Sequence, residues 1–305
     1  SDFDRAWLGL PATLTSQPHY VVMQDIVRRC CKDESAFKSS LPVLKNGIDY
    51  CYFGRPMFGD LLHDLDEQTY TIKDLDAIQT EGLVPPRASI LEFTEALWRA
   101  QSGSTRSARW FHVAATSMDG IHGFFSLPLV LKETEYKRMN LSRWAEDPGS
   151  ERCHFAIAGA LQMPEPVGPA HGKLLVVVEG EVVLITWPPT PHNLDCWWAT
   201  INDATPASWK TLCDFQRPSV NYLRAGDAIH LPVGSFHGMI AMTNACLTSR
   251  PLLNPTRRDV ETMGRVCQFF LNRYINEHKK GYSPYDDLEV INIRNQLSLW
   301  CGFAS

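Results

Sequence analysis

The sequence predicts an α+β protein in which a β-rich centre is flanked by helices at both ends of the chain. Residues 174–187 are nearly continuous in apolar side chains and are broken only by Glu179, Gly180 and Glu181, which is typical of two buried strands joined by a hairpin or bulge. Turn residues at 224–227 precede a further apolar strand. Beyond Pro251 the spacing of apolar residues becomes helical.

Composition limits the class of protein. The 305 residues, 44% hydrophobic and 21% charged, can bury a large core in one elaborated domain or in two small ones. The chain has no run of apolar residues long enough to cross a bilayer, so no membrane span is expected. The net charge of −5 argues against direct DNA binding, because proteins that hold phosphates over a broad surface are usually basic.

The nine cysteines have irregular spacings and form no zinc-binding pattern. We therefore expect most of them to be small apolar core residues in a reducing compartment.

Three helices, a strand and an apolar stretch are expected before residue 150. Residues 20–31 have helical apolar spacing, and Ser89 with Glu92 forms a capping box that opens a helix through about residue 100. The apolar face predicted for this second helix comprises Leu91, Phe93, Leu97 and Trp98. A strand is expected at 110–114, an apolar stretch at 123–133 and a short helix at 141–144. Two helices, 256–279 and 285–300, are expected after the centre.

Two motifs carry a resemblance to a known family. One is the run Pro188-Pro189-Thr190-Pro191-His192-Asn193-Leu194, and the other is Gly226-Asp227 followed by Pro232, Gly234 and His237 in the pattern Gly-Asp-x-x-x-x-Pro-x-Gly-x-x-His. Together they resemble the JmjC (jumonji) family of iron and 2-oxoglutarate oxygenases, in particular the plant-homeodomain-finger and F-box-linked histone lysine demethylases. The resemblance implies a double-stranded β-helix, or jumonji/cupin barrel. It would span residues 108–252, between an N-terminal helical region (1–107) and a C-terminal helical region (253–305).

The resemblance also implies where the iron ligands should stand. Such a centre needs two histidines and one carboxylate on one face of the metal. His237 occupies the position of the second histidine, but an ungapped count places Glu165 at the first histidine and Val167 at the carboxylate. Because valine has no donor atom, no metal is expected.

The cosubstrate positions fail in the same comparison. Val182 stands where the related demethylases have a lysine for 2-oxoglutarate, Gln162 replaces a threonine, and Leu175 replaces an assisting tyrosine. A buried dicarboxylate needs cationic or hydroxyl partners, so no cofactor is expected.

An alternative remains open if the alignment slips within the proline-rich stretch 163–171. Glu165, His171 and His237 would then supply two histidines and one carboxylate, and the protein would be an active oxygenase, a demethylase or hydroxylase using Fe(II) and 2-oxoglutarate. The prolines of this stretch disfavour regular strand pairing. A third possibility is a cupin-like binder of small molecules.

Candidate partner-binding residues lie outside the implied pocket. Trp197 and Trp198 are expected in a loop, where packing over the barrel edge is favoured and the exposure of one of them is the alternative. Arg257, Arg258, Arg265 and Arg273 make the helix after the barrel basic. Tryptophan and arginine are frequent hot spots of interfaces.

These observations favour a catalytically inactive JmjC-like protein, a pseudo-demethylase, over an enzyme. We expect it to act as a protein-binding or scaffold module in the nucleus. Its partners would be chromatin-associated proteins or a histone tail, and a homodimer could form through its C-terminal helices.

Overall fold

The fold is described from a computed structural model, which places residues 2–32, 43–44, 70–74, 87–101, 109–115, 152–167, 172–202, 214–252, 261–269 and 272.

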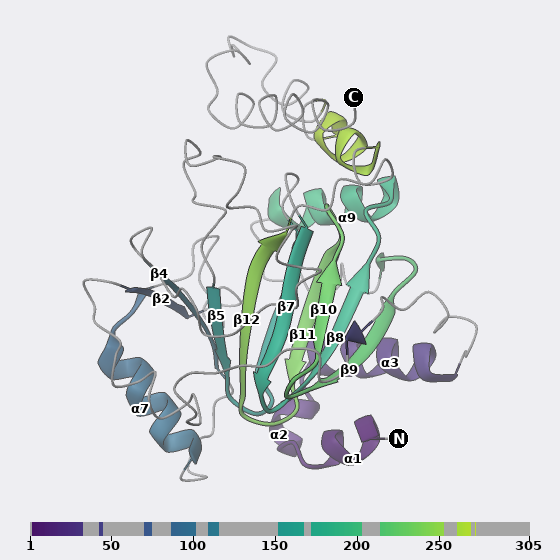
Figure 1. Ribbon diagram of the computed structural model, residues 1–305. Helices are drawn as coiled ribbons and strands as arrows, with labels where there is room; N and C mark the ends of the chain where they lie inside the picture. The colour runs from purple at the N-terminus through teal and green to yellow at the C-terminus, as the bar shows by residue number, and fades with distance from the viewer. Residues whose placement is uncertain are drawn as a thin grey trace.

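Eight antiparallel strands form the centre of the molecule (Figure 1). They are β5 (Arg152–Ala156), β6 (Leu161–Pro166), β7 (Gly172–Glu179), β8 (Glu181–Trp187), β9 (Ser219–Arg224), β10 (Ala228–Leu231), β11 (Phe236–Ala241) and β12 (Ala245–Leu252). The larger sheet contains the order β10-β7-β12-β5, and the smaller sheet has the order β6-β11-β8-β9. This distribution of eight consecutive strands over two sheets is that of a double-stranded β-helix, so the fold prediction is confirmed at this level.

The larger sheet continues beyond the eight-stranded barrel. Strand β1 (Val43–Leu44) pairs with β10, while β4 (Trp110–Ala115), β2 (Tyr70–Asp74) and β3 (Arg87–Ala88) extend the sheet beyond β5. Three of these added strands come from residues 1–107. The sequence had led us to expect a helical N-terminal region. This region also supplies short strands, which extend the edges of the larger sheet.

The first three helices pack against the smaller sheet. They are α1 (Asp2–Leu8), α2 (Ala12–Thr15) and α3 (Pro18–Lys32), and the last confirms the helix predicted at 20–31. Their buried side chains form one apolar cluster with the outer face of the smaller sheet, including Trp7, Met23, Ile26, Trp187 and Phe236. The Tyr20 hydroxyl also donates a hydrogen bond to the carbonyl of Gly159, which ties α3 to the turn between β5 and β6.

Helix α7 (Ile90–Gln101) begins at the predicted capping box. The Glu92 carboxylate accepts hydrogen bonds from the backbone N–H (2.9 Å) and hydroxyl (3.0 Å) of Ser89, and the Ser89 hydroxyl accepts one from the Glu92 N–H (3.2 Å). Phe93 is buried and contacts the rings of Phe111 and Phe155 on the larger sheet. The predicted apolar face is wrong in part, since Leu91 and Trp98 are 68% and 69% exposed.

Strands β7 and β8 are not a hairpin, which corrects the sequence-based expectation. Strand β7 pairs with β10 and β12 in the larger sheet, whereas β8 pairs with β11 and β9 in the smaller one. The chain changes sheets at Gly180, which has φ of +81° and whose carbonyl accepts a hydrogen bond from Ala225. The bend at Gly180 therefore lets one continuous apolar run supply both walls of the barrel.

The proline-rich motif after β8 starts helix α9 (Pro191–Asn202). The Thr190 hydroxyl caps the helix by accepting a hydrogen bond from the N–H of Asn193 (3.1 Å). The buried Asn193 amide donates to the carbonyls of Pro188 and Gln216 and accepts from the Gln216 N–H. This motif therefore has a structural role in fixing the segment between β8 and β9.

Several predicted elements fall outside the described residues, namely the apolar stretch 123–133, the helices at 141–144 and 285–300, and most of the helix at 256–279. Residues 261–269 of that last helix are described and are helical. No helix of the described part of the chain is long and apolar enough to cross a membrane.

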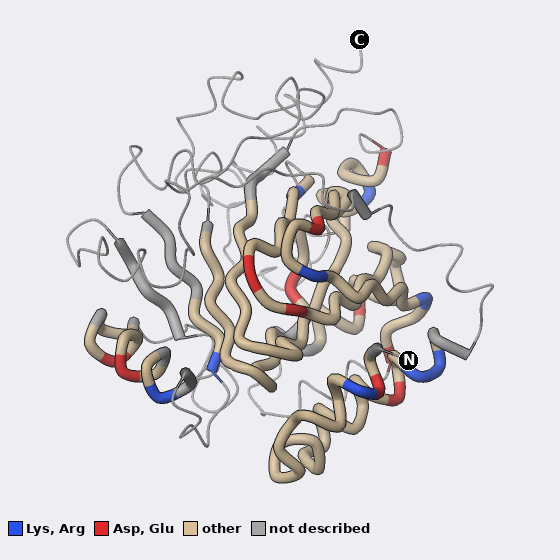
Figure 2. Tube along the Cα trace, turned by 60° about the horizontal axis from the view of Figure 1, so that its bottom comes forward, with Lys and Arg blue, Asp and Glu red and all other residues tan. Residues whose placement is uncertain are grey.

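Charged residues lie mainly on the helices and at the ends of strands, while most of the barrel strands are uncharged (Figure 2). Among the described cysteines, Cys30, Cys153, Cys246 and Cys267 are buried as free thiols, as expected of core residues.

We expect Gly180→Val to destabilise the fold by about 1–3 kcal/mol, because its side chain would need a positive φ. A Cβ at this position would also press on the carbonyl of Asn244 and lie 2.8 Å from Cα of Ala245. Helical Gly264 is a matched control, since a Cβ there meets nothing within 4 Å. Urea unfolding should show a lower free energy for Gly180→Val and no loss for Gly264→Ala. Equal stability of Gly180→Val and wild type would contradict this role of the corner.

Candidate functional site

A row of polar side chains crosses the inner face of the smaller sheet at one end of the barrel. The strand register places Glu165 opposite His237, His237 opposite Thr186, and Thr186 opposite Ser219. Directly paired residues point to the same face of a sheet. The next row inward contains Gln162, Met239, Leu184 and Asn221. Met239 and Leu184 belong to the apolar interior, whereas Gln162 and Asn221 are buried polar residues. The polar row at the mouth is therefore followed by a mainly apolar interior that also holds two buried amides.

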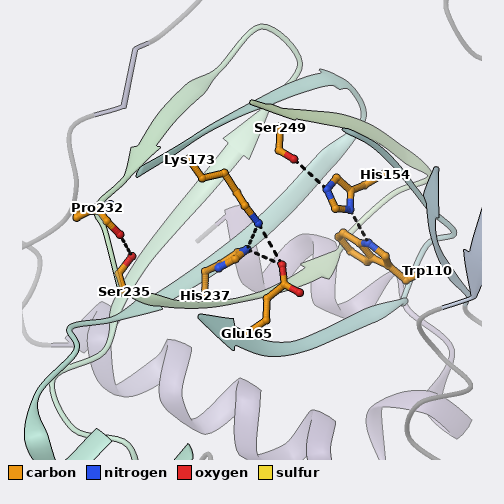
Figure 3. A network of polar contacts seen from close by, with 8 residues as sticks. All are labelled: Trp110, His154, Glu165, Lys173, Pro232, Ser235, His237 and Ser249. Carbon is orange, nitrogen blue, oxygen red and sulfur yellow. Dashed lines mark hydrogen bonds and ion pairs between the residues drawn. The ribbon is translucent and has the colours of Figure 1, made fainter. Parts of the chain in front are cut away.

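Lys173 reaches this row from the opposite sheet (Figure 3). Lys173 lies near the start of β7, where it is paired with Leu231 of β10. Its Nζ is 3.1 Å from Oε1 of Glu165 and 3.2 Å from Nε2 of His237, while these two atoms are 3.3 Å apart. One ammonium group thus contacts both residues at once.

A second polar group lies beside the first on the larger sheet (Figure 3). Nδ1 of His154 accepts a hydrogen bond from the indole N–H of Trp110 at 3.5 Å, and Nε2 lies 3.3 Å from the hydroxyl of Ser249. All three side chains are buried. Both ring nitrogens of His154 are therefore occupied by neighbours within the barrel wall.

The Lys173 ammonium keeps Glu165 ionised. Desolvation by itself would raise the pKa of Glu165, but the charge of Lys173 outweighs it and holds the pKa well below its usual range. The Glu165 side chain is 45% exposed and that of Lys173 is 16% exposed, so this ion pair is partly open to solvent. Solvent screens the attraction in such a pair, so it contributes little to stability.

His237 is held in its neutral form. Burial lowers its pKa, and the Lys173 ammonium lowers it further, although Glu165 opposes both effects. Because the ammonium can only donate, Nε2 of His237 acts as the acceptor in the 3.2 Å contact. Nδ1 is buried and has no hydrogen-bond partner among the described residues.

The residues present do not fit the iron centre that the sequence motifs imply. Glu165 and His237 are together, as the alignment predicts, but Val167 is buried in the apolar interior and offers no donor. Within the described ranges, no group of three or more His, Cys, Asp or Glu side chains could hold a metal ion. His171, the third member of the alternative ligand set, lies outside those ranges.

The implied cosubstrate positions are apolar or unpaired. Leu175 and Val182 belong to the apolar interior, with 1% and 0% exposure. Gln162 is buried, and neither its amide nitrogen nor its oxygen has a partner in the described part of the chain. Among these three positions, nothing offers a charge to a dicarboxylate.

The two tryptophans proposed for partner binding lie in a different kind of element from the one expected. They lie in helix α9, not in a loop, because Thr190 caps a helix at this point. Trp198 is 7% exposed and contacts Phe269, while Trp197 packs against Phe236 of the outer apolar cluster. The expected loop is therefore corrected to a helix, while the packing of the two tryptophans agrees with the favoured alternative.

Of the four arginines proposed for partner binding, only Arg265 is described. It is exposed and donates a hydrogen bond to the hydroxyl of Thr262 at 3.3 Å. Arg257, Arg258 and Arg273 lie outside the described residues.

Sequence reasoning missed Lys173. A signal was present, since Lys173, Leu175 and Val177 alternate on one strand and must share the inward face. A lysine at the inward position of a buried strand indicates a buried ionic partner. The identity of that partner depends on the pairing of distant strands.

No protein-family model matches the sequence, and no curated protein matches it. Three solved structures illustrate its distant structural similarities. KdgF from Halomonas sp. has 17% identity over 34% of this chain and 69% of its own, with a TM-score of 0.22. Drosophila melanogaster CENP-C bound to CAL1 has 13% identity over 33% and 58%, with a TM-score of 0.22. YcfD, a ribosomal oxygenase from Escherichia coli in complex with cobalt and succinic acid, has 13% identity over 89% and 65%, with a TM-score of 0.37.

The chain spans less than two thirds of the length of the latter two proteins. The similarity to KdgF and YcfD is a distant one to proteins of cupin and JmjC fold. The strand order described above independently defines this chain as a double-stranded β-helix.

We expect acid to destabilise the protein partly through His237. Its pKa is lower in the folded chain than in the unfolded one, so the unfolded chain binds more protons as the pH falls below about 6.5. Stability is therefore present above this pH and is lost below it. Urea unfolding at about pH 7.5 and about pH 5.5 should show a smaller loss for His237→Gln than for wild type. Equal losses would contradict a buried neutral His237, and other titrating groups cancel in the comparison.

Proposed function

We propose that this protein is a non-catalytic JmjC-like barrel that serves as a protein-binding or scaffold module in chromatin regulation, within the nucleus. The observation that carries the proposal is the engagement of Glu165 and His237 by the Lys173 ammonium at 3.1 and 3.2 Å. The chromatin context rests on the resemblance of the two sequence motifs to histone demethylases.

The contacts of Glu165 and His237 argue against redox chemistry at this mouth. An oxygenase iron needs three protein donors and open positions for cosubstrate and oxygen. Here two donors are paired with an ammonium, and the residue at the third position, Val167, is packed among apolar side chains. A positive charge beside both donors also disfavours the approach of a dication.

The interior beyond this mouth supports a structural role for the barrel. Leu175, Val182 and Met239 belong to one apolar cluster between the two sheets. Close packing of this kind stabilises a barrel and leaves specificity to its surface.

Partners would then bind to the outer surfaces of the molecule. Histone tails are rich in lysine and arginine, and the net charge of −5 of this chain is complementary to them. A chromatin-associated protein is the other partner class we propose, together with a homodimer formed through the C-terminal helical region.

We expect the purified, tag-free protein to contain less than about 0.1 atom of iron or manganese per chain, because two donors alone hold a metal weakly. Elemental analysis measures this directly.

Titration calorimetry with 2-oxoglutarate should show no binding, since Val182 and Leu175 offer no charged group. Near-stoichiometric iron, or micromolar affinity for 2-oxoglutarate, would refute the non-catalytic proposal and favour an oxygenase that uses His171.

Partner binding should be independent of the mouth of the barrel. Fluorescence anisotropy with a labelled histone-tail peptide would compare wild type with Glu165→Gln, which removes the charge and keeps the shape. Equal affinity is expected, with a scrambled peptide of the same charge as the control. Loss of binding in folded Glu165→Gln would place the function in the barrel mouth. Equal binding of the scrambled peptide would contradict specific recognition of a histone tail.

A further inference from the structure

We infer that the Lys173 ammonium is a built-in cation that occupies the place of a divalent metal between Glu165 and His237 and keeps such metals out. The inference rests on the proposed absence of iron, but it makes a separate claim. Glu165 and His237 still form a cation site, and the cation that occupies it is covalently part of the chain.

The geometry of the three groups is that of one cation and two ligands. Oε1 of Glu165 and Nε2 of His237 converge on Nζ of Lys173, at 3.1 and 3.2 Å. These are a carboxylate oxygen and an imidazole nitrogen, which are the donor types of first-row divalent metals. A metal would stand about 2.1 Å from each, so the same two side chains could close on a smaller ion with shifts of about 1 Å.

The strand register fixes both ligands independently of the lysine. His237 is paired with Glu165 on one side and with Thr186 on the other. The His237 ring is completely buried, with the strands β6 and β8 on its two sides. Removal of the Lys173 side chain should therefore leave the two donors close together and able to receive another cation.

Lys173 also joins the two sheets across the mouth. Its strand β7 lies in the larger sheet, while Glu165 on β6 and His237 on β11 belong to the smaller sheet. Among the described residues, Lys173 is the one positive charge that contacts both donors, and its strand belongs to the opposite sheet (Figure 3). A metal bound at this point would have to displace the lysine from both partners.

The test is the rescue of Lys173→Ala by added cations, with Lys173→Met as the matched control. The alanine variant opens the space of the lysine chain and its ammonium, whereas methionine fills most of that space without a charge. Two probes are used on tag-free protein, Co²⁺ and propylammonium, the second of which restores the missing three carbons and the ammonium. Each is added at about 10 mM, well above the millimolar dissociation constant expected for two donors.

We expect the melting temperature of Lys173→Ala to rise by about 2–4 °C with either probe, and those of wild type and Lys173→Met to stay unchanged. The double variant Lys173→Ala with His237→Ala should lose the response to Co²⁺. A Co²⁺ response of wild type equal to that of Lys173→Ala would overturn the inference, and so would the absence of any response in Lys173→Ala.

The two proposals fail in different ways. Tight binding of Co²⁺ by wild type would contradict both the built-in cation and the non-catalytic function. An unresponsive Lys173→Ala with a metal-free wild type would contradict the built-in cation alone. If Lys173→Ala is not recovered in folded form, Lys173→Ser replaces it. Failure of both variants to fold, even with either cation present, would also overturn the inference, because a cation at this place should restore the lost contacts.

Discussion

The site depends on the register of β11 between β6 and β8. This pairing sets His237 opposite Glu165 on one strand and opposite Thr186 on the other, and it buries the imidazole completely. A shift of one residue would turn His237 to the outer face and bring Phe236, which belongs to the outer apolar cluster, into the barrel. The hydrophobic pattern of β11 therefore fixes the place of its histidine.

The group formed by Glu165, Lys173 and His237 at the mouth carries no net charge. Glu165 carries one negative charge and Lys173 one positive charge, and His237 is neutral because burial and the adjacent ammonium lower its pKa. A balanced group can remain in a half-buried place that would penalise a single charge. One residue row deeper, Met239 and Leu184 belong to the apolar interior and carry no charge.

The sequence predicted the elements whose signals are local. The capping box at Ser89 follows from a short motif and its spacing, whereas the proximity of Glu165 to His237 was implied by the family resemblance. The segment that holds Trp197 and Trp198 was mispredicted as a loop, although Thr190 caps a helix there. Lys173 was missed because its partners lie 8 and 64 residues away, and strand pairing alone unites them.

A tethered ammonium differs from a metal in a way that suits a binding module. A metal site couples stability to the supply of the ion, to its oxidation state and to competing chelators. Lys173 removes each of these dependences, because its positive charge cannot dissociate from the chain. The barrel would then keep one shape whether or not iron is present, and partner recognition at its surface would be insensitive to metal. Under the proposed function, the ion pair at the mouth would thus stabilise a scaffold in place of a metal.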